Sequence, residues 1–460
     1  MAQLAGQPLR RIVVVGCGFA GLSAINRLGE LIGDDPCVDV LLLDCHNYHL
    51  FTPLLYQVAT GGLEPGMIAY PARIIAREHG FRYLETTVHA IDVEKKWLDT
   101  DAGSIEFDSL ILAPGSVTNF FGMSDAEDNS LPLKWVNDGV RIRNHVVNAF
   151  ELADRETKSD RRQALLTFTI VGGGATGVEL ASSLSDMIFG SLLPNYPTIG
   201  PDEVRLILIE ARGTLLPGWN AKMGEAAAEH LQRNHVQVRL ETTVAHVTDR
   251  DVEIGDGQRL PSATVIWTAG VRAASLVGTL PGEKERDGRI RVDRNLELPE
   301  HPGIFIVGDA AAVYLPDAQR PMPPTAWAAL GQGEAAAENA VRRLSGAVPQ
   351  AFAMRPPGDL VSLGRGAAAA DIMGIVFDGL PGWLLRRGVY LLNLVGFRNR
   401  LLVAMEWVFV TFRQRTIASF VSLSELQRIL APPARLRPRA ARPRVRTPAE
   451  TAVEEERKAG

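Results

Sequence analysis

The segment Arg11-Ile-Val-Val-Val-Gly16-Cys17-Gly18-Phe19-Ala20-Gly21 decides the fold of the first part of the chain. The β-branched run before Gly16 predicts a buried parallel strand, and the apolar spacing after Gly21 predicts an amphipathic helix. Gly16 permits a tight turn, Gly18 lets backbone amides approach a pyrophosphate, and Gly21 allows close helix packing. We therefore interpret this turn, with Phe19 and Ala20 opening the helix, as a dinucleotide-binding site.

A second copy of the same pattern occurs about 160 residues downstream. After the first fingerprint, residues 38–44 predict a strand that ends in Asp44, whose carboxylate would accept hydrogen bonds from a ribose. The second fingerprint is Gly172-Gly-Gly174-Ala-Thr-Gly177, again between a strand and a helix, and Glu210 closes its next strand. Two fingerprints in one chain predict two bound dinucleotides.

Two further motifs indicate which dinucleotide each site holds. Gly303-Ile-Phe-Ile-Val-Gly308-Asp309 resembles the Gly-Asp motif of two-dinucleotide flavoproteins, in which the acid binds the ribityl chain of FAD. Ala113-Pro114-Gly115 occupies the place of their Ala-Thr-Gly turn. These motifs assign FAD to the first site and a nicotinamide dinucleotide to the second.

The acid of the second site predicts a preference between nicotinamide cofactors. The Glu210 carboxylate would pair with both ribose hydroxyls and repel a 2′-phosphate, so we expect NADH to be preferred over NADPH. Arg212 could weaken this preference by reaching a phosphate, but we favour its interpretation as a solvated surface arginine.

Composition and cysteine usage exclude several classes of protein. At 460 residues the chain needs several domains, and its net charge of −5 gives no general attraction to nucleic acid. The N-terminus shows no secretory signal. The three cysteines are Cys17, Cys37 and Cys45, with no C-x-x-C pair. Disulfide reductases and sulfide:quinone oxidoreductases, which need later or paired cysteines, are therefore excluded, and we expect no metal site.

Three longer segments resemble those of type II NADH dehydrogenases: residues 47–61 (NYHLFTPLLYQVATG), Thr268-Ala269-Gly270-Val-Arg272 and residues 396–400 (GFRNR). The resemblance covers roughly residues 10 to 420. It implies a peripheral enzyme, homodimeric, on the cytoplasmic face of the cell membrane, passing electrons from NADH through FAD to a respiratory quinone. It also implies that Ala269 and Gly270 belong to the cofactor site.

The resemblance further implies that Glu179 lies near the nicotinamide and flavin rings. The alternative is an acid near the start of a helix, favoured there by the helix dipole.

The helix after Pro324 departs from the family pattern. The family carries Ala-Gln-x-Ala-x-Gln there, whereas this chain has Ala326-Trp327-Ala-Ala-Leu-Gly331. Trp327 offers one N–H in place of an amide, and Gly331 leaves a gap on the same face that the indole would fill. Gln332 points about 100° around the helix and is not an obvious substitute. Either Trp327 and Gly331 reshape the acceptor site, or Trp327 is a core residue and the acceptor docks elsewhere.

Residues 380–421 combine apolar side chains with six arginines and one acid, Glu406, a net charge of +5. Because Arg398 and Arg400 interrupt the apolar runs, no stretch reaches the roughly 20 residues that spanning a bilayer needs. We expect this segment to lie on the membrane surface. The alternative is a dimer interface or a cover over the flavin domain.

These observations together predict an α/β chain with two nested Rossmann-like, dinucleotide-binding domains, of the glutathione-reductase-like flavoprotein type. The predicted parts are an FAD-binding domain in two pieces, an NADH-binding domain, a C-terminal amphipathic membrane and dimer region, and a disordered tail: respectively 10–135 with 283–350, 164–282, 351–421 and 422–460.

The predicted function is non-proton-pumping NADH:quinone oxidoreduction, with two alternatives. The first is an NADH-dependent flavoprotein reductase with another acceptor, motivated by Trp327 and Gly331. The second is a non-enzymatic signalling flavoprotein resembling apoptosis-inducing factor, motivated by six arginines within residues 435–446 that could bind nucleic acid. A solvated tail is the favoured interpretation of those arginines, so nucleic acid is an unlikely partner.

Overall fold

The computed structural model describes residues 9–33, 35–316, 318–354, 358–372, 374–412 and 417–419. Residues 1–418 form one compact unit, and residues 419–460 form a second, of which only Ser419 is described. The predicted tail at 422–460 and two arginines of the basic segment, Arg413 and Arg415, therefore lie outside the described residues.

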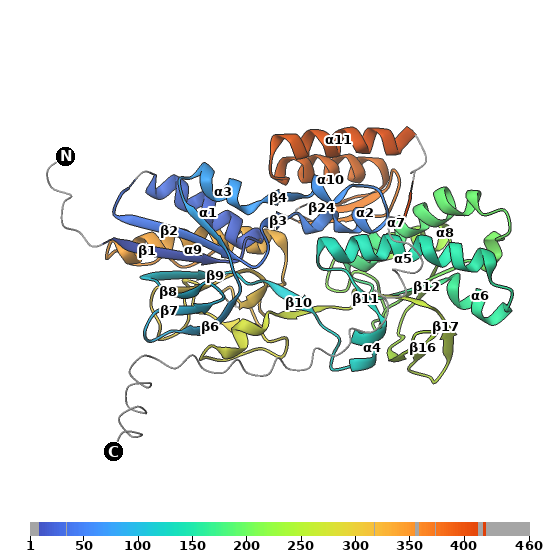
Figure 1. Ribbon diagram of the computed structural model, residues 1–460, viewed down its shortest axis with the longest axis horizontal. Coiled ribbons are helices and arrows are strands. Elements are labelled where there is room, and N and C mark those ends of the chain that lie inside the picture. Colours follow the sequence, from blue (N-terminus) through green and yellow to red (C-terminus); the bar gives the residue numbers. More distant parts are fainter. Residues whose placement is uncertain are drawn as a thin grey trace, which may run out of the picture. The chain divides into compact units, whose positions relative to one another are not determined.

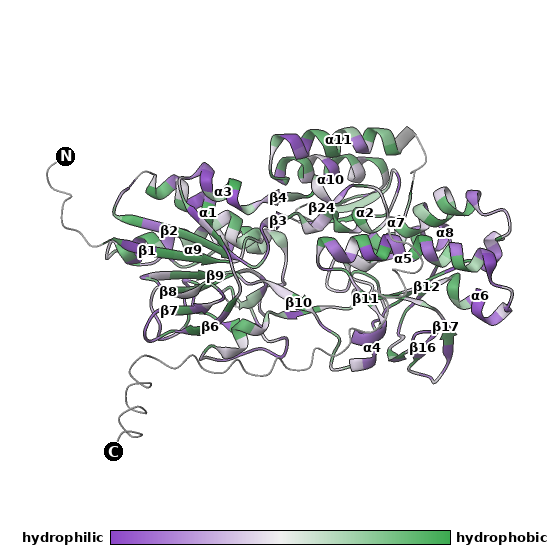
Figure 2. Ribbon diagram, in the orientation of Figure 1, coloured by the Kyte–Doolittle hydropathy of each residue, from purple (hydrophilic) through white to green (hydrophobic). Residues whose placement is uncertain are grey.

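The first sheet is a five-stranded parallel sheet built from segments far apart in the sequence. Its order is β21-β9-β1-β2-β5, which correspond to Ile304–Ile306, Ser109–Leu112, Arg10–Val15, Val38–Asp44 and Arg82–Glu85. Ile12, Val13 and Val14 are fully buried in β1, as expected for a strand covered on both faces. Figure 2 shows the hydrophobic residues gathered in these strands.

The helices α1 (Phe19–Ile32) and α9 (Ala326–Leu344) pack closely against each other beside this sheet (Figure 1). The approach is closest at Gly333, where a Cβ would lie 2.1 Å from the carbonyl oxygen of Ala20. Buried alanines continue the contact surface of α9 at Ala336, Ala337 and Ala340. Helix α9 carries the predicted acceptor-site residues Trp327 and Gly331 in its first turns. It is therefore packed against α1, the helix that follows the first fingerprint.

The second sheet is also parallel and five-stranded. Its order is β11-β18-β12-β13-β14, which correspond to Leu131–Pro132, Thr264–Trp267, Thr167–Val171, Arg205–Ile209 and Val236–Arg239. Its helices are α5 (Val136–Arg155), α6 (Ser159–Leu165), α7 (Ala175–Met187) and α8 (Ala221–Arg233). Strand β11 pairs here although its residues fall within the range 10–135 that we predicted for the first domain.

The second sheet and its helices are inserted into the part of the chain that forms the first sheet, through two adjacent strands. The chain leaves the first sheet through β10 (Ser116–Thr118) and comes back through β19 (Val271–Ala273), and these two strands pair antiparallel. The predicted fold class, two nested parallel α/β units, is confirmed.

Smaller elements accompany the two parallel sheets and their helices. Two three-stranded antiparallel sheets comprise β6-β7-β8 (Val88–Asp92, Trp97–Thr100, Gly103–Glu106) and β15-β16-β17 (Val244–Val247, Asp251–Ile254, Arg259–Pro261). The remaining helices are α2 (Leu55–Ala59), α3 (Ala72–Glu78) and α4 (Ser124–Asn129). Short strand pairs are β3 (Tyr48–Leu50) with β4 (Ala69–Pro71), and β20 (Ile290–Arg291) with β22 (Ala311–Ala312).

The region after α9 is more regular than the sequence suggested. Within the segment predicted as an amphipathic region, an antiparallel sheet forms from β23 (Asp359–Ser362), β24 (Ala368–Ile372) and β25 (Ile375–Phe377). Its central strand begins with three alanines, which carry little strand propensity, so local pattern gave no signal. Two helices follow, α10 (Gly379–Asn393) and α11 (Phe397–Phe412) (Figure 1). Within the described residues, no helix has the length and apolar character required to cross a membrane.

A buried ion pair joins α10 to α7. Arg386 Nη2 lies 2.7 Å from Glu179 Oε1, and the same oxygen accepts the backbone N–H of Ser362 at 2.9 Å. Arg386 and Glu179 are 3% and 6% exposed. Arg386 was predicted as one of the charges of a membrane-facing segment, but its guanidinium is buried inside the protein and paired with Glu179. This part of the prediction is wrong because Arg386 points into the protein, where it neutralises the buried carboxylate of Glu179.

The close contact between α1 and α9 predicts that Gly333→Ala destabilises the protein. The added Cβ would collide with the backbone of Ala20, and overpacking of this kind costs about 1–3 kcal/mol. We expect the thermal unfolding midpoint of the purified protein to shift down by about 1–3 °C. Gly388→Ala is the control, since no described atom outside its chain neighbours and its own helix backbone lies within 4 Å of a Cβ there. An unchanged midpoint for Gly333→Ala would contradict the packing described.

The ion pair predicts a strongly pH-dependent loss of stability in Arg386→Met. Without the guanidinium, a buried carboxylate remains unpaired, which costs about 3–5 kcal/mol. Because burial already raises the pKa of Glu179, protonation relieves part of this cost, so the loss should be larger at pH 8 than at pH 5. Urea unfolding, monitored by circular dichroism, measures the free energy of unfolding of the wild type and the variant at pH 5 and at pH 8. The double variant Glu179→Gln/Arg386→Met should recover most of the loss; additive losses would show that the pair is not coupled.

Candidate functional site

A cavity of about 680 Å³ connects most of the predicted site residues. Its walls come from the first fingerprint, the Gly308–Asp309 turn, the start of α7, the start of α9 and one face of α10. A cavity of this size, with mostly apolar walls and a few polar groups, is typical of a cofactor or small-molecule site.

The first fingerprint forms a turn that excludes side chains on one side and leaves space on the other. Gly16 has a φ of 97°, and a Cβ there would lie 2.1 Å from the carbonyl oxygen of Ala113. A Cβ at Gly21 would lie 1.8 Å from the carbonyl oxygen of Gly16. At Gly18, by contrast, no described atom beyond its two chain neighbours comes within 4 Å of a Cβ. The backbone N–H groups at the start of α1 therefore open onto the cavity, where a pyrophosphate fits.

Asp44 is held in place by the fingerprint that it serves. Its Oδ2 accepts the backbone N–H of Cys17 at 2.5 Å, and its Oδ1 accepts that of His46 at 2.7 Å. Asp44 lines the cavity beyond the helix N-terminus, where the sequence placed the ribose of a dinucleotide.

His46 and Cys45 complete a small polar group with Asp44. Cys45 Sγ lies 3.2 Å from His46 Nδ1, and hydrogen bonding to Asp44 and Cys45 raises the pKa of His46 to about 10. In the described part of the chain, these three residues are the one group close enough to share a metal ion. Both carboxylate oxygens of Asp44 already accept backbone N–H groups, so they are engaged in the turn.

The Gly308–Asp309 turn also lines the cavity and is supported by residues that we did not predict from the sequence. Ser116 Oγ donates to Asp309 Oδ2 at 2.5 Å, and Lys134 Nζ donates to Ser116 Oγ at 2.7 Å. Lys134 Nζ also lies 3.5 Å from Asp309 Oδ2. Ser116 directly follows Ala113-Pro114-Gly115, which also lines the cavity, but nothing in the sequence relates Lys134 to Asp309.

The second fingerprint repeats the geometry of the first. Gly172 has a φ of 110°, and a Cβ there would lie 2.6 Å from the Cα of Ala269. A Cβ at Gly177 would lie 1.8 Å from the carbonyl oxygen of Gly172, while no described atom lies within 4 Å of one at Gly174. The N-terminus of α7 is thus as open as that of α1, and the residues fit a second dinucleotide.

Glu210 occupies the position that Asp44 has in the first site. Its Oε2 accepts the backbone N–H of Gly173 at 2.6 Å, and its Oε1 accepts that of Arg212 at 2.8 Å. The side chain of Glu210 is 9% exposed. Arg212 is exposed, as the interpretation of a solvated arginine requires.

Glu179 lies where α7 meets the cavity, paired with Arg386. Burial raises the pKa of Glu179, although Arg386 opposes this shift. Burial would lower the pKa of Arg386, but the neighbouring Tyr56, Tyr390 and Glu179 outweigh it and the pKa is raised. The guanidinium therefore stays charged. It lies 4.2 Å from the ring centre of Tyr390 and 5.5 Å from that of Tyr56, and both tyrosines line the cavity.

At the start of α9, only one of the two predicted acceptor-site residues reaches the cavity. Trp327 lines it, together with Leu330. Gly331 is not among the described residues of its walls, and the space beside it is taken by Met354 and Phe352. A Cβ at Gly331 would lie 2.9 Å from Met354 Sδ. The expectation that the indole fills this gap is therefore wrong, because a later segment covers it first.

Gln332 has a different role from the amides of the family pattern. Its Oε1 accepts the backbone N–H of Gly308 at 2.7 Å, and the side chain is buried. It supports the Gly308–Asp309 turn rather than facing the cavity.

The cavity thus unites the predicted residues of the first site with Glu179 and Trp327, while other predicted residues lie around it. The fingerprint residues Gly16, Gly18, Phe19 and Ala20 line it, as do Asp44, Ala113, Pro114, Gly115, Gly308 and Asp309. Gly21, Gly172, Gly177 and Ala269 act in the backbone turns. Gly174, Glu210 and Gly270 are likewise outside its described walls, with Phe121 lying 3.4 Å from a Cβ at Gly270.

Comparison with known proteins agrees with this arrangement. The model of the pyridine nucleotide-disulphide oxidoreductase family matches residues 10–333. A type II NADH:quinone oxidoreductase of Mycobacterium tuberculosis is 33% identical over 424 residues, covering 88% of this chain and 89% of that protein. One from Staphylococcus aureus is 28% identical over 376 residues, covering 81% and 91%.

Solved structures show the same fold. The structure of NDH2 from Plasmodium falciparum in complex with NADH has a TM-score of 0.80 at 18% identity, covering 89% of this chain and 100% of that one. The predicted resemblance is therefore confirmed over most of the chain. The chain belongs to the pyridine nucleotide-disulphide oxidoreductase family of oxidoreductases and, within it, to the type II NADH:quinone oxidoreductases.

Proposed function

We propose that this protein binds FAD and NADH and transfers electrons from NADH through FAD to a quinone. The observation that carries the proposal is a single cavity that runs from the first phosphate-binding turn past Glu179 to an apolar wall on α9 and α10. Family membership supports the same reaction. A cavity that holds a flavin between a nicotinamide and an acceptor is what two successive electron transfers require.

The residues of the first turn would hold FAD. The N-terminus of α1 would bind its pyrophosphate, Asp44 the adenosine ribose and Asp309 the ribityl chain. FAD, once bound, supplies the chemistry of accepting a hydride and releasing electrons. Ser116 and Lys134 would orient Asp309, since both contact its carboxylate or the hydroxyl bonded to it.

The second turn would hold NADH, with the N-terminus of α7 at its pyrophosphate. Glu210 is already fixed by two backbone N–H groups, so its carboxylate is oriented before the cofactor arrives. A fixed negative charge repels a 2′-phosphate, so NADH should be preferred over NADPH. Ala269 and Gly270 lie at the closing turn of the same domain, within the proposed range 164–282.

Glu179 would lie beside the reacting rings, because it lines the cavity just beyond the start of α7. Its carboxylate already accepts hydrogen bonds from Arg386 and Ser362. The group therefore provides a fixed charge pair at the boundary between the nicotinamide side and the acceptor side of the cavity. The acceptor would contact Trp327, Leu330 and the face of α10 that includes Val389 and Tyr390.

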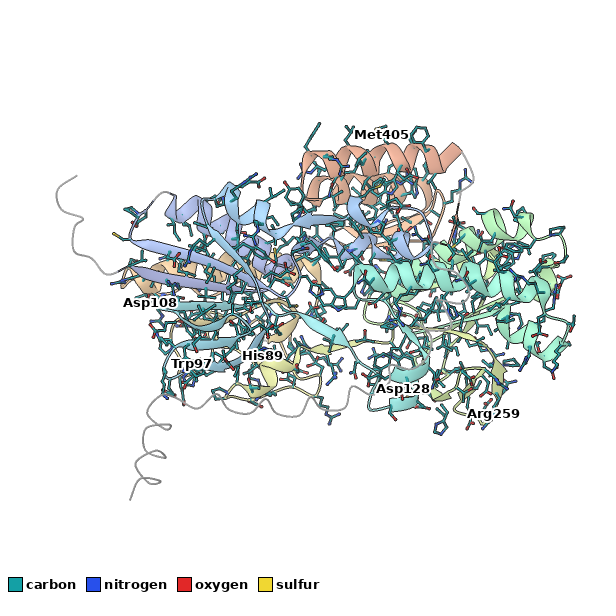
Figure 3. All side chains as sticks on the ribbon, in the orientation of Figure 1. His89, Trp97, Asp108, Asp128, Arg259 and Met405 are labelled. Atoms are coloured by element: carbon teal, nitrogen blue, oxygen red, sulfur yellow. The ribbon has the colours of Figure 1, made fainter. Side chains whose placement is uncertain are left out.

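We further propose that α10 and α11 attach the protein to a membrane surface, at the cytoplasmic face of the cell membrane. Both helices expose apolar residues at helical spacing: Leu380, Leu384 and Leu392 on α10, and Phe397, Leu401, Met405, Val408 and Phe409 on α11. Figure 3 shows Met405 on α11. An exposed apolar stripe of this kind is typical of helices that lie in a membrane interface. The region 351–421 would then deliver a lipid-soluble quinone to the cavity, and a homodimer is compatible with the same surface.

The electron path predicts two separable half-reactions. Mixed anaerobically in a stopped-flow instrument, NADH should bleach the flavin absorbance at least about tenfold faster than NADPH at equal concentration, because the fixed Glu210 carboxylate repels the 2′-phosphate. Adding ubiquinone-1 to the reduced protein should restore the flavin absorbance. Glu210→Gln is the matched variant and should narrow the difference between the nucleotides. Reoxidation by oxygen or ferricyanide but by no quinone would favour the alternative of a different acceptor.

The apolar stripe predicts that charge on α11 abolishes membrane binding. Leu401 and Val408 are 50% and 57% exposed, and burying the exposed half of both side chains contributes about 1.5–3 kcal/mol in total. Leu401→Glu/Val408→Glu should therefore reduce co-sedimentation with phosphatidylglycerol and phosphatidylethanolamine vesicles by at least about tenfold. Val348→Glu is the control, because Val348 is 81% exposed but lies outside the stripe. Equal binding by all three proteins would refute the assignment of the surface.

A further inference from the structure

A short hydrogen-bond relay leads from α11 to the cavity. The indole Nε1 of Trp407 donates to Gln57 Oε1 at 2.8 Å, and Gln57 Nε2 donates to the hydroxyl oxygen of Tyr56 at 2.9 Å. Trp407 and Tyr56 are both 4% exposed. Both ends of the relay are therefore buried and Gln57 between them is partly exposed; the relay joins the helix with the apolar stripe to a residue of the cavity wall.

The chemistry of these three groups fixes the direction of every hydrogen bond. An indole N–H can only donate, so the amide atom that faces Trp407 must be the oxygen of Gln57. The other end of the amide is then an NH2 group, which can only donate, so the Tyr56 oxygen must accept from it. The hydroxyl hydrogen of Tyr56 is left for another partner. Among the hydrogen bonds between described residues, none receives this hydrogen.

The position of Tyr56 indicates which groups its hydroxyl hydrogen could be donated to. Tyr56 lines the cavity, and its ring lies beside Arg386, within the group that also contains Glu179 and Tyr390. On α9, the family pattern places two amides, whereas among the described α9 residues of the cavity wall Trp327 is the one whose side chain carries an N–H. A carbonyl acceptor bound at this end of the cavity needs a donor, and α9 supplies fewer than the family pattern does.

We propose that Tyr56 donates a hydrogen bond to a carbonyl oxygen of the quinone, and that Gln57 and Trp407 are positioning residues for this donor. The proposal rests on the proposed function. As the quinone takes up electrons, negative charge grows on its carbonyl oxygen and the hydrogen bond from Tyr56 strengthens. Tyr56 keeps its proton throughout: of the two hydrogens of the quinol, one is balanced by the hydride taken from NADH and one is taken up from solvent as a proton. The bond therefore lowers the barrier without entering the proton balance.

The relay also connects the donor to α11. Trp407 lies on the same helix as Leu401, Met405 and Val408, which expose the apolar stripe. The orientation of the Tyr56 hydroxyl is therefore fixed by a residue of the segment proposed to contact the membrane.

The test separates the two half-reactions in three single variants. Tyr56→Phe removes the donor, while Gln57→Glu reverses its direction, because a carboxylate at residue 57 would accept both the indole N–H and the Tyr56 hydroxyl. Tyr196→Phe is the matched control, since its hydroxyl donates to Glu151 away from the cavity. Each FAD-loaded protein is reduced anaerobically with NADH at pH 8, then mixed either with ubiquinone-1 or with ferricyanide, which has no carbonyl group.

We expect Tyr56→Phe and Gln57→Glu to be reduced by NADH at the wild-type rate and reoxidised by ubiquinone-1 about five- to tenfold more slowly, the effect of one lost hydrogen bond. Reoxidation by ferricyanide and the behaviour of Tyr196→Phe should not change. If reoxidation by ubiquinone-1 and reoxidation by ferricyanide slow equally, or if ubiquinone-1 reoxidises both variants at the wild-type rate, the role of Tyr56 is refuted. If the wild-type protein is reduced by NADH but not reoxidised by ubiquinone-1, the proposed function itself fails, and the Tyr56 proposal fails with it.

Discussion

Both halves of the molecule depend on the same backbone constraint at the end of a central strand. In each fingerprint the turn is so tight that a side chain would overlap a carbonyl oxygen, and the second residue of the turn donates its N–H to an acid from the next strand, Asp44 in one case and Glu210 in the other. The acids are thus oriented by the turns themselves. Helix N-termini with free N–H groups and a carboxylate fixed beside them recognise a dinucleotide by its pyrophosphate and ribose.

The parts of the fold that could be predicted from the sequence are those in which local chemistry alone determines structure. Glycines that must approach a backbone, β-branched strands and an acid at a strand end gave both parallel sheets and the first site. The C-terminal sheet was missed because the alanines of β24 have no local preference for a strand. Contacts between distant segments were equally invisible, as with Lys134 beside Asp309 and Arg386 beside Glu179.

The C-terminal helices serve the site as well as the surface. The sequence showed a basic, apolar segment, which we expected to lie on the membrane surface. In the folded protein Arg386 neutralises Glu179, and Arg387 lies between the rings of Trp383 and Trp407, 3.5 and 4.8 Å from their centres. Guanidinium groups held over aromatic rings are stabilised by the ring electrons. Two consecutive arginines thus fasten α10 to the core on one side and to α11 on the other.

The paired strands β10 and β19 carry a consequence for how such a chain could arise. Ser116 lies opposite Ala273 in this ladder, so the outgoing and the returning segments of the polypeptide run side by side before β21 joins the first sheet. A whole second copy of the ancestral nucleotide-binding gene segment can be spliced in at such a point without altering the order of the existing strands. The connection consists of two paired strands. Gene duplication followed by insertion is therefore a simple evolutionary origin for an enzyme with two cofactors.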